Sequence, residues 1–443
     1  MTVIERFATF ACDFDPPKAA RTAASNCLLD WFGAALAGSV EPPATFLRKA
    51  FPGTGTARLL PDGETRDPRT AALINATASH IVEVDDIYRS GLYHPGVVTI
   101  PAALALGDHR NISGVRLIRA IIAGYEVSNR IARAVNPSHY QHWHTTGTVG
   151  HFGAAVAACV AIDLNAGQTA HALATVTTFA AGLRHAFSSD GMSKPLHAGR
   201  AAEAGVTAAL MAESGVTGVL DMLEGERGFG VAMSADVDWQ DACASLGSEW
   251  TITQTTPKAH ACCGHNFAAL DAIQHLMRTH AIDASEVSNI EVASYRAAMD
   301  ICGNPNPQTP AEARFSLPWC AAVMARSDTV TPAAFSYDAL DDQQTRALAA
   351  RVSLKLDPEA EARFPGARSA TVRMHLVDGK TVVHHRPTRK GDPDDPMTQA
   401  DLSAKFHALS KPVIGDAQAT ALAREISLTE ELSHLRTLPI GQA

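Results

Sequence analysis

Three basic side chains stand together in a stretch of small apolar residues at 193–200. The stretch contains Lys194, His197 and Arg200, and its surroundings are rich in Ala and Gly. Burying cations among such residues costs desolvation energy unless an anion meets them. The block therefore predicts a pocket for a small polycarboxylate, and the competing interpretation is a surface Lys with a helix-packing Arg. Because Lys194 precedes Pro195, we expect it in an extended loop before the next helix.

A second group combines acids with a histidine. Glu83, Asp85 and Asp86 lie within four positions at the predicted end of a helix, and His94 follows before a Pro-Gly break. A carboxylate near a histidine can orient it and tune it as a proton carrier. The alternative interpretation is a solvated acidic loop.

A third group is rich in histidine and glycine. His142, His144 and His151 surround a predicted helix start with glycines at 147, 150 and 153. Such glycines let a ligand approach backbone N–H groups, and a helix N-terminus attracts anions. We interpret His144 as the ligand-facing residue. The three histidines could instead bind zinc, but no His-Glu-x-x-His helix and no Cys-x-x-Cys pair accompanies them, so we predict no metal. Ordinary core or surface histidines are a further alternative.

A fourth group contains Lys258 followed by two adjacent cysteines, Cys262 and Cys263. Adjacent cysteines cannot act as a simple zinc-binding pair, and a disulfide between neighbours is strained. We interpret them as buried small apolar residues. A catalytic thiol would need a perturbing neighbour, for which His260 and His265 are available.

The elements that must position these groups change in type along the chain. The first 250 residues predict Ala-rich helices, whose small side chains let helices approach closely. These helices cover 18–37, 69–82, 114–135, 152–164, 166–183 and 199–214. Alternating apolar residues then predict strands at 288–295, 352–356, 370–376 and 381–384, with helices at 266–280 and 318–325 between them.

This change predicts a mostly α fold with an α+β second domain. We expect a helical domain over 1–254, an α+β lid domain over 255–396, and helices over 397–443 that return to the helical domain.

Composition excludes several classes of function. A net charge of -9 argues against non-specific binding to nucleic acid or to an anionic membrane surface, and no apolar run is long enough to span a bilayer. Eight dispersed cysteines and the absence of a signal-peptide pattern favour a cytoplasmic location. No Gly-x-Gly-x-x-Gly or phosphate-loop motif is present, so we predict no nucleotide or other cofactor.

Taken in order, the groups resemble the MmgE/PrpD family. The similarity also includes an early Asp-Trp-Phe-Gly helix at 30–33 and a Gly-Tyr-Glu-Val helix at 124–127, and it covers nearly the whole chain. The resemblance implies a large helical domain, a smaller α+β lid, a homodimer and no cofactor. The family's catalytic positions match Asp85, Asp86, His94, His144, Lys194 and Lys258.

We further predict that the substrate is bound by Glu83, His197, Arg200 and Trp319. Glu83 stands where many family members have Asp, Trp319 stands where many have Tyr, and Lys-Ala-His-Ala at 258–261 replaces Lys-Pro-Tyr-Pro. The resemblance implies a lyase that removes a proton alpha to a carboxylate, most simply a 2-methylcitrate dehydratase. A cis-aconitate decarboxylase and an iminodisuccinate epimerase are alternatives in the same pocket. A non-catalytic carboxylate-binding protein and a metallohydrolase are alternatives of other classes.

Overall fold

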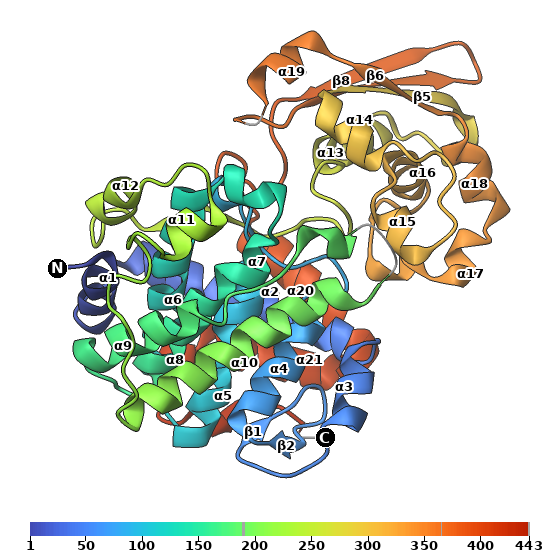
Figure 1. Ribbon diagram of the computed structural model, residues 1–443. Coiled ribbons are helices and arrows are strands. Elements are labelled where there is room, and N and C mark those ends of the chain that lie inside the picture. Colours follow the sequence, from blue (N-terminus) through green and yellow to red (C-terminus); the bar gives the residue numbers. More distant parts are fainter. Residues whose placement is uncertain (188–190, 365, 442–443) are drawn as a thin grey trace. The chain divides into compact units, whose positions relative to one another are not determined.

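The computed structural model describes residues 1–187, 191–364 and 366–441, and the chain in it forms two compact units. Unit 1 comprises Met1–Pro257 and Thr398–Ala443, and unit 2 comprises Lys258–Met397. Unit 1 is mostly helical, whereas unit 2 combines helices with a sheet (Figure 1). The predicted fold class, a helical domain with an α+β second domain, is confirmed.

Unit 1 contains the long helices and two short strand pairs, β1 with β2 and β3 with β4. Its helices are α1 (Val3–Cys12), α2 (Lys18–Ser39), α3 (Ala44–Ala50), α4 (Pro68–Ser79), α5 (Gly96–Arg110), α6 (Gly114–Val135), α7 (Thr145–Thr148), α8 (Gly150–Ala161), α9 (Ala166–Thr177), α10 (Ser193–Glu213), α11 (Phe229–Met233), α12 (Trp239–Ala244), α20 (Gln399–Ile414) and α21 (Asp416–Ser427). Its strands are β1 (Ala57–Arg58), β2 (Thr65–Arg66), β3 (Ile87–Tyr88) and β4 (Thr255–Thr256).

Small residues let the helices of unit 1 pack closely. A Cβ added to Gly205 on α10 would lie 2.5 Å from the Cβ of Ala154 on α8. A Cβ added to Gly33 on α2 would lie 3.3 Å from Leu409 Cδ1 on α20, so the C-terminal helices pack against the N-terminal ones (Figure 1). Larger side chains at such contacts would force the helices apart and lose core packing.

Unit 2 is built on a four-stranded sheet of order β6-β5-β7-β8. β5 pairs with β6 in parallel, and the other pairs are antiparallel. The strands are β5 (Val287–Ser294), β6 (Val352–Leu356), β7 (Ala370–Leu376) and β8 (Thr381–Arg386). The helices are α13 (Phe267–His280), α14 (Arg296–Cys302), α15 (Pro310–Arg314), α16 (Leu317–Ser327), α17 (Tyr337–Leu340), α18 (Gln343–Ala349) and α19 (Pro358–Arg363).

The sheet of unit 2 buries one face. Val372 and Met374 on β7 are fully buried, and α13 packs on β7 and β8. The alternation of apolar and polar residues therefore has its usual cause, one face against helices and one toward solvent. Gly379 takes a φ of +88° in the turn between β7 and β8, a conformation that glycine adopts at little cost.

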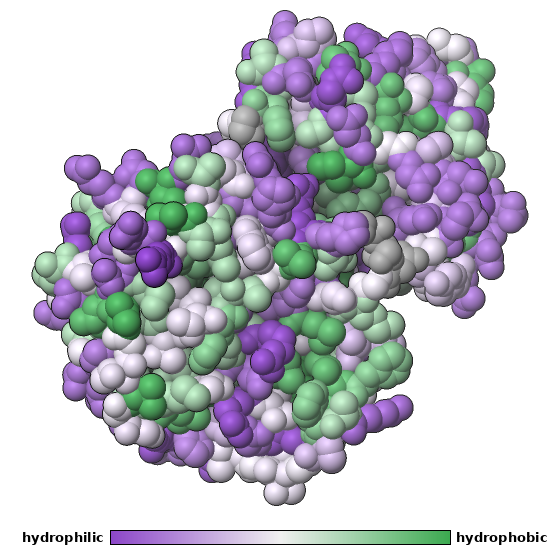
Figure 2. Space-filling view, in the orientation of Figure 1, coloured by the Kyte–Doolittle hydropathy of each residue, from purple (hydrophilic) through white to green (hydrophobic). Residues whose placement is uncertain are grey.

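The surface of the molecule is mixed in polarity. On the face shown in Figure 2, hydrophilic residues are spread over both units and hydrophobic residues form small separate patches. None of the helices in the described part of the chain combines the length and the apolar character that crossing a bilayer requires.

Candidate active site

An irregular loop carries the acidic residues of unit 1. It follows the end of α4 at Ser79, three residues before the predicted helix end. Glu83 has a φ of +57°, which turns the chain sharply. Lys405 of α20 holds the loop, because its Nζ donates to Val84 O at 2.6 Å and to Asp30 Oδ1 at 2.5 Å. The consecutive acids consequently point into different surroundings.

Asp85 lies between two imidazole rings. Its Oδ2 is 2.9 Å from His80 Nδ1 and 2.7 Å from His94 Nδ1. Each ring that donates its Nδ1–H to this carboxylate keeps Nε2 as the atom that can gain or lose a proton. Burial lowers the pKa of His80 to about 3, against the opposing effect of Asp85, so His80 is neutral at pH 7. His94 is less buried, with 17% of its side chain exposed.

Asp86 faces the core instead. Its Oδ2 accepts a hydrogen bond from Tyr125 Oη at 2.7 Å, and its Oδ1 accepts one from the backbone N–H of Gly96 at 3.0 Å. Burial raises the pKa of Asp86 to about 7. Asp86 therefore fixes the start of α5, and its backbone carbonyl lies 2.9 Å from His94 Nδ1. Of the two predicted acids, only Asp85 points its carboxylate at the histidines.

Two more histidines complete a group that we call the histidine cluster: His80, His94, His144 and His197. His144 precedes α7, and its Nδ1 lies 3.0 Å from His197 Nδ1 on α10. The ring of His144 also stacks on His80, with centroids 5.6 Å apart and planes 10° apart. Burial, followed by the neighbouring histidines, holds the pKa of His144 well below its usual range, and burial also lowers the pKa of His197.

Lys194 and Glu83 form an ion pair beside this cluster. The Lys194 Nζ also lies 5.7 Å from the centroid of the Phe187 ring, which packs edge-on against His144. The expectation that Lys194 lies in an extended loop was wrong, because α10 already begins at Ser193. Pro195 falls in the first turn, where a missing N–H costs nothing.

A cavity of about 930 Å³ adjoins the cluster. His197 lines it, together with His151, Arg69 and Arg200. Arg200 pairs with Glu203 and is 68% exposed, so it belongs to the mouth of this cavity and not to the histidine cluster. The cavity is lined by several cationic or ionisable nitrogens, which suits an anionic ligand.

The two remaining predicted residues belong to unit 2. Lys258 is buried in the segment before α13. Trp319 on α16 is 1% exposed, and its indole Nε1 donates to Ala334 O at 3.2 Å. Trp319 is therefore a core side chain of unit 2 whose polar group is satisfied by the backbone.

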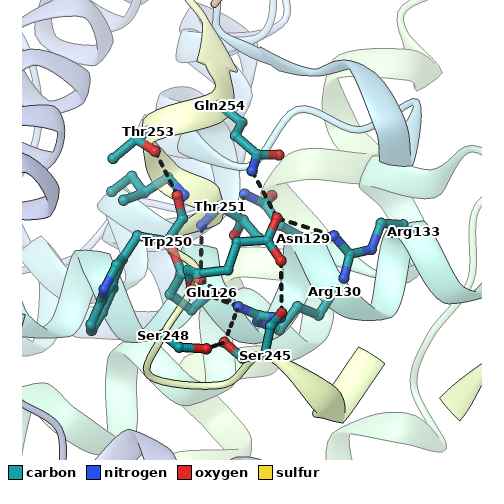
Figure 3. A network of polar contacts seen from close by, with 12 residues as sticks. Glu126, Asn129, Arg130, Arg133, Ser245, Ser248, Trp250, Thr251, Thr253 and Gln254 are labelled. Atoms are coloured by element: carbon teal, nitrogen blue, oxygen red, sulfur yellow. Dashed lines mark hydrogen bonds and ion pairs between the residues drawn. The ribbon is translucent and has the colours of Figure 1, made fainter. Parts of the chain in front are cut away.

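A buried network, drawn in Figure 3, fixes the segment that leads out of unit 1. Glu126 on α6 accepts hydrogen bonds from the backbone N–H groups of Thr251 and Ile252 at 3.0 and 2.9 Å. Arg130, one turn later, donates to Ser245 O and Glu249 O at 3.1 and 2.7 Å. Just after this segment, β4 pairs with β3, which directly follows Asp86. The network thereby helps to position the acidic loop.

Sequence reasoning did not assign His80 and Tyr125 to the site. His80 stands only three residues before Glu83, and a histidine so close to an acidic run was the available signal. Tyr125 lies in the motif at 124–127, but nothing in its spacing from Asp86 predicts their hydrogen bond.

One trio in the described part of the chain has the spacing of metal ligands. It consists of His80, Asp85 and His94, whose ligand atoms lie within 4.8 Å of one another. It differs from the histidine set at 142, 144 and 151 considered from the sequence. The same geometry also suits a carboxylate that orients two imidazoles for proton transfer.

The curated relatives of the chain share one printed activity. Over 84% of this chain and 78% of its own length, the human cis-aconitate decarboxylase is 25% identical. The cis-aconitate decarboxylase of Aspergillus terreus is 24% identical over 96% of this chain and 92% of its own length. The cis-aconitate decarboxylase-like protein oryM of Aspergillus oryzae is 24% identical over 97% and 94%.

Family models cover most of the chain. The MmgE/PrpD N-terminal domain matches residues 5–242, and the MmgE/PrpD C-terminal domain matches residues 260–430. The first match alone spans more than half of the sequence, and the two together contain nine of the ten predicted site residues, all but Lys258. The chain therefore belongs to the MmgE/PrpD family.

Proposed function

We propose that this protein is a cofactor-independent decarboxylase of a small unsaturated tricarboxylate, with cis-aconitate as the first candidate. The observation that carries the proposal is the Asp85 carboxylate between the imidazoles of His80 and His94, next to the Lys194–Glu83 ion pair. The relatives' printed activity favours decarboxylation over the dehydration of 2-methylcitrate that the sequence first indicated.

The reaction needs charge stabilisation and one proton. In cis-aconitate, a carboxylmethyl group is attached to a carbon–carbon double bond. When the bond to that carboxylate breaks, carbon dioxide leaves and the electron pair moves through the double bond to the carbon beside another carboxylate. A proton then adds to this carbon, which gives 2-methylenesuccinate. Cations and N–H donors aimed at the carboxylates lower the energy of the carbanion.

In this proposal, His94 gives the proton from Nε2. Its Nδ1–H is held by Asp85, so the carboxylate fixes the ring and stabilises the imidazolium form that donates. His80 shares the same carboxylate oxygen and restricts its movement. This arrangement assigns Asp85 to positioning and His94 to the transfer itself.

The other residues bind the anionic groups. Lys194 supplies a cation that Glu83 orients, and Glu83 reaches this position because the loop turns there. The neutral rings of His144 and His197 supply N–H donors, which bind a carboxylate without adding fixed charge. Lys258 is proposed as a further catalytic cation on the strength of the family resemblance.

Proton NMR in deuterated water tests the proposal with the full-length protein. We expect cis-aconitate to give 2-methylenesuccinate with one deuterium on its saturated methylene carbon. His94→Gln should abolish this product, whereas His109→Gln, which changes a histidine bonded to Thr56 at the far end of α5, should retain it.

The same experiment separates the alternatives. Conversion of 2-methylcitrate to an alkene, with cis-aconitate unchanged, would refute the decarboxylase and support a dehydratase. Deuterium uptake into a substituted succinate with an unchanged skeleton would support an epimerase instead.

A further inference from the structure

Unit 2 contains a pair of cysteines in contact that the proposed function does not use. Cys263 lies in the segment just before α13 and is partly exposed, whereas Cys302 ends α14 and is fully buried. The two thiols are hydrogen-bonded to each other. The adjacent Cys262 contacts Cys320 instead, so the two cysteines at 262 and 263 face different partners.

The surroundings of Cys263 favour its thiolate. Its sulfur accepts a hydrogen bond from the Cys302 thiol and another from the backbone N–H of His265, at the start of the 14-residue helix α13. The N-terminal end of a helix stabilises a thiolate. The hydrogen bond from Cys302 is the largest influence, and together with these donors and the nearby cations it lowers the pKa of Cys263 to about 6 despite burial.

A buried guanidinium adds to this effect. Arg368 is 8% exposed, and within the described residues its Nε has no hydrogen-bond partner. Its charge acts on Cys263, and its guanidinium lies 6.0 Å from the centroid of the Phe364 ring. Burial, followed by repulsion from Arg389, lowers the pKa of Arg368, and a thiolate at Cys263 offsets part of that cost.

We infer that Cys263 and Cys302 form a redox-reactive dithiol, in which Cys263 attacks a hydroperoxide and Cys302 completes a disulfide. In the first step the Cys263 thiolate bonds to one peroxide oxygen, the O–O bond breaks, and the sulfenic acid forms as hydroxide leaves. In the second step the Cys302 sulfur attacks the Cys263 sulfur, and a disulfide forms as water leaves. The peroxide is reduced by two electrons and the two cysteines are oxidised by two.

Other pairings fit the structure less well. A disulfide between Cys262 and Cys263 would be strained, because the residues are adjacent. A four-cysteine metal site is not supported either, since the one ligand group with metal spacing in the described part of the chain is the trio in unit 1. The inference stands independently of the proposed decarboxylase activity.

Alkylation by iodoacetamide, mapped by peptide mass spectrometry, tests the first half of the inference. Cys12 is the matched internal control, because it is also partly exposed but burial raises its pKa above 9.0. At pH 7 we expect Cys263 to react at least about 4-fold faster, since its roughly 90-fold larger thiolate fraction outweighs a roughly 20-fold lower intrinsic nucleophilicity. The rate at Cys263 should level off above pH 7, whereas that at Cys12 should keep rising.

Peroxide treatment tests the second half. The wild type should lose about 2 Da, the mass of two hydrogens, and peptide mapping should place the disulfide between Cys263 and Cys302. Cys302→Ser should instead accumulate a sulfenic acid at Cys263 that dimedone traps, and Cys262→Ser should still form the disulfide. Reaction of Cys263 no faster than Cys12, or a disulfide that involves Cys262, would overturn the inference.

Discussion

Replacing Asp86 by Asn tests the division of labour between the two adjacent acids. In the folded protein, burial gives Asp86 a pKa of about 7, compared with an ordinary value of 3.8. Folded Asp86 therefore retains a proton that the unfolded chain releases above about pH 4. Its contribution to stability is present at low pH and is lost as the pH rises through 7.

The size of this effect follows from the two pKa values. Proton linkage gives a loss of about 2–3 kcal/mol in the free energy of unfolding between pH 5 and pH 8 from this one group. Asp86→Asn cannot titrate, so the variant should lack this part of the pH dependence. Its single amide oxygen cannot accept from both Tyr125 and Gly96 as the acid does, which should cost about 1 kcal/mol at pH 5.

Urea unfolding of both proteins at pH 5 and pH 8 measures the difference. Because all other titrating groups are shared, their effects cancel when the variant is subtracted from the wild type. We expect the wild type to be the more stable protein at pH 5 and to lose its advantage, or to become the less stable protein, at pH 8. An unchanged difference, or a larger advantage of the wild type at pH 8, would refute the interpretation of Asp86 as a buried acid that holds the start of α5.

Three further substitutions test the elements that support the site. Glu126→Gln removes the charge that faces Arg130 and one backbone hydrogen bond, so urea unfolding should show a loss of about 3 kcal/mol; an unchanged midpoint would contradict this. Lys405→Met removes the cation bonded to Asp30 and should cost about 3–5 kcal/mol in the same measurement, whereas a stabilised variant would show that the pair is dispensable. Gly96→Ala places a Cβ 2.6 Å from a tyrosine oxygen, so melting temperature and kcat should both fall, and a fully active variant of normal stability would show that α5 can shift freely.

The sequence predicts the elements better than the contacts between them. Helical periodicity and Ala content place the helices of unit 1, and alternation places the strands of unit 2, because both signals are local. The ends of α4 and α10 differ from the prediction, since a loop turn at Glu83 and a proline in the first turn of α10 decide them.

The candidate site shows the limit more clearly. The residue types that gather there were visible from the sequence, but the opposite directions of Asp85 and Asp86 depend on the irregular loop between α4 and β3. The contact between His144 and His197 joins residues 53 positions apart and follows only from helix packing. Spacing along the chain carries no information on either arrangement.

The most direct test of the central claim compares kcat for cis-aconitate decarboxylation in Asp85→Asn and Asp86→Asn. Asp85 is the carboxylate that contacts His80 and His94, so its loss should lower kcat by about 10²–10⁴-fold, the usual range for a group that orients a proton carrier. Asp86→Asn should stay within about 10-fold of the wild type, because its carboxylate faces Tyr125. A greater loss in Asp86→Asn than in Asp85→Asn would contradict the account.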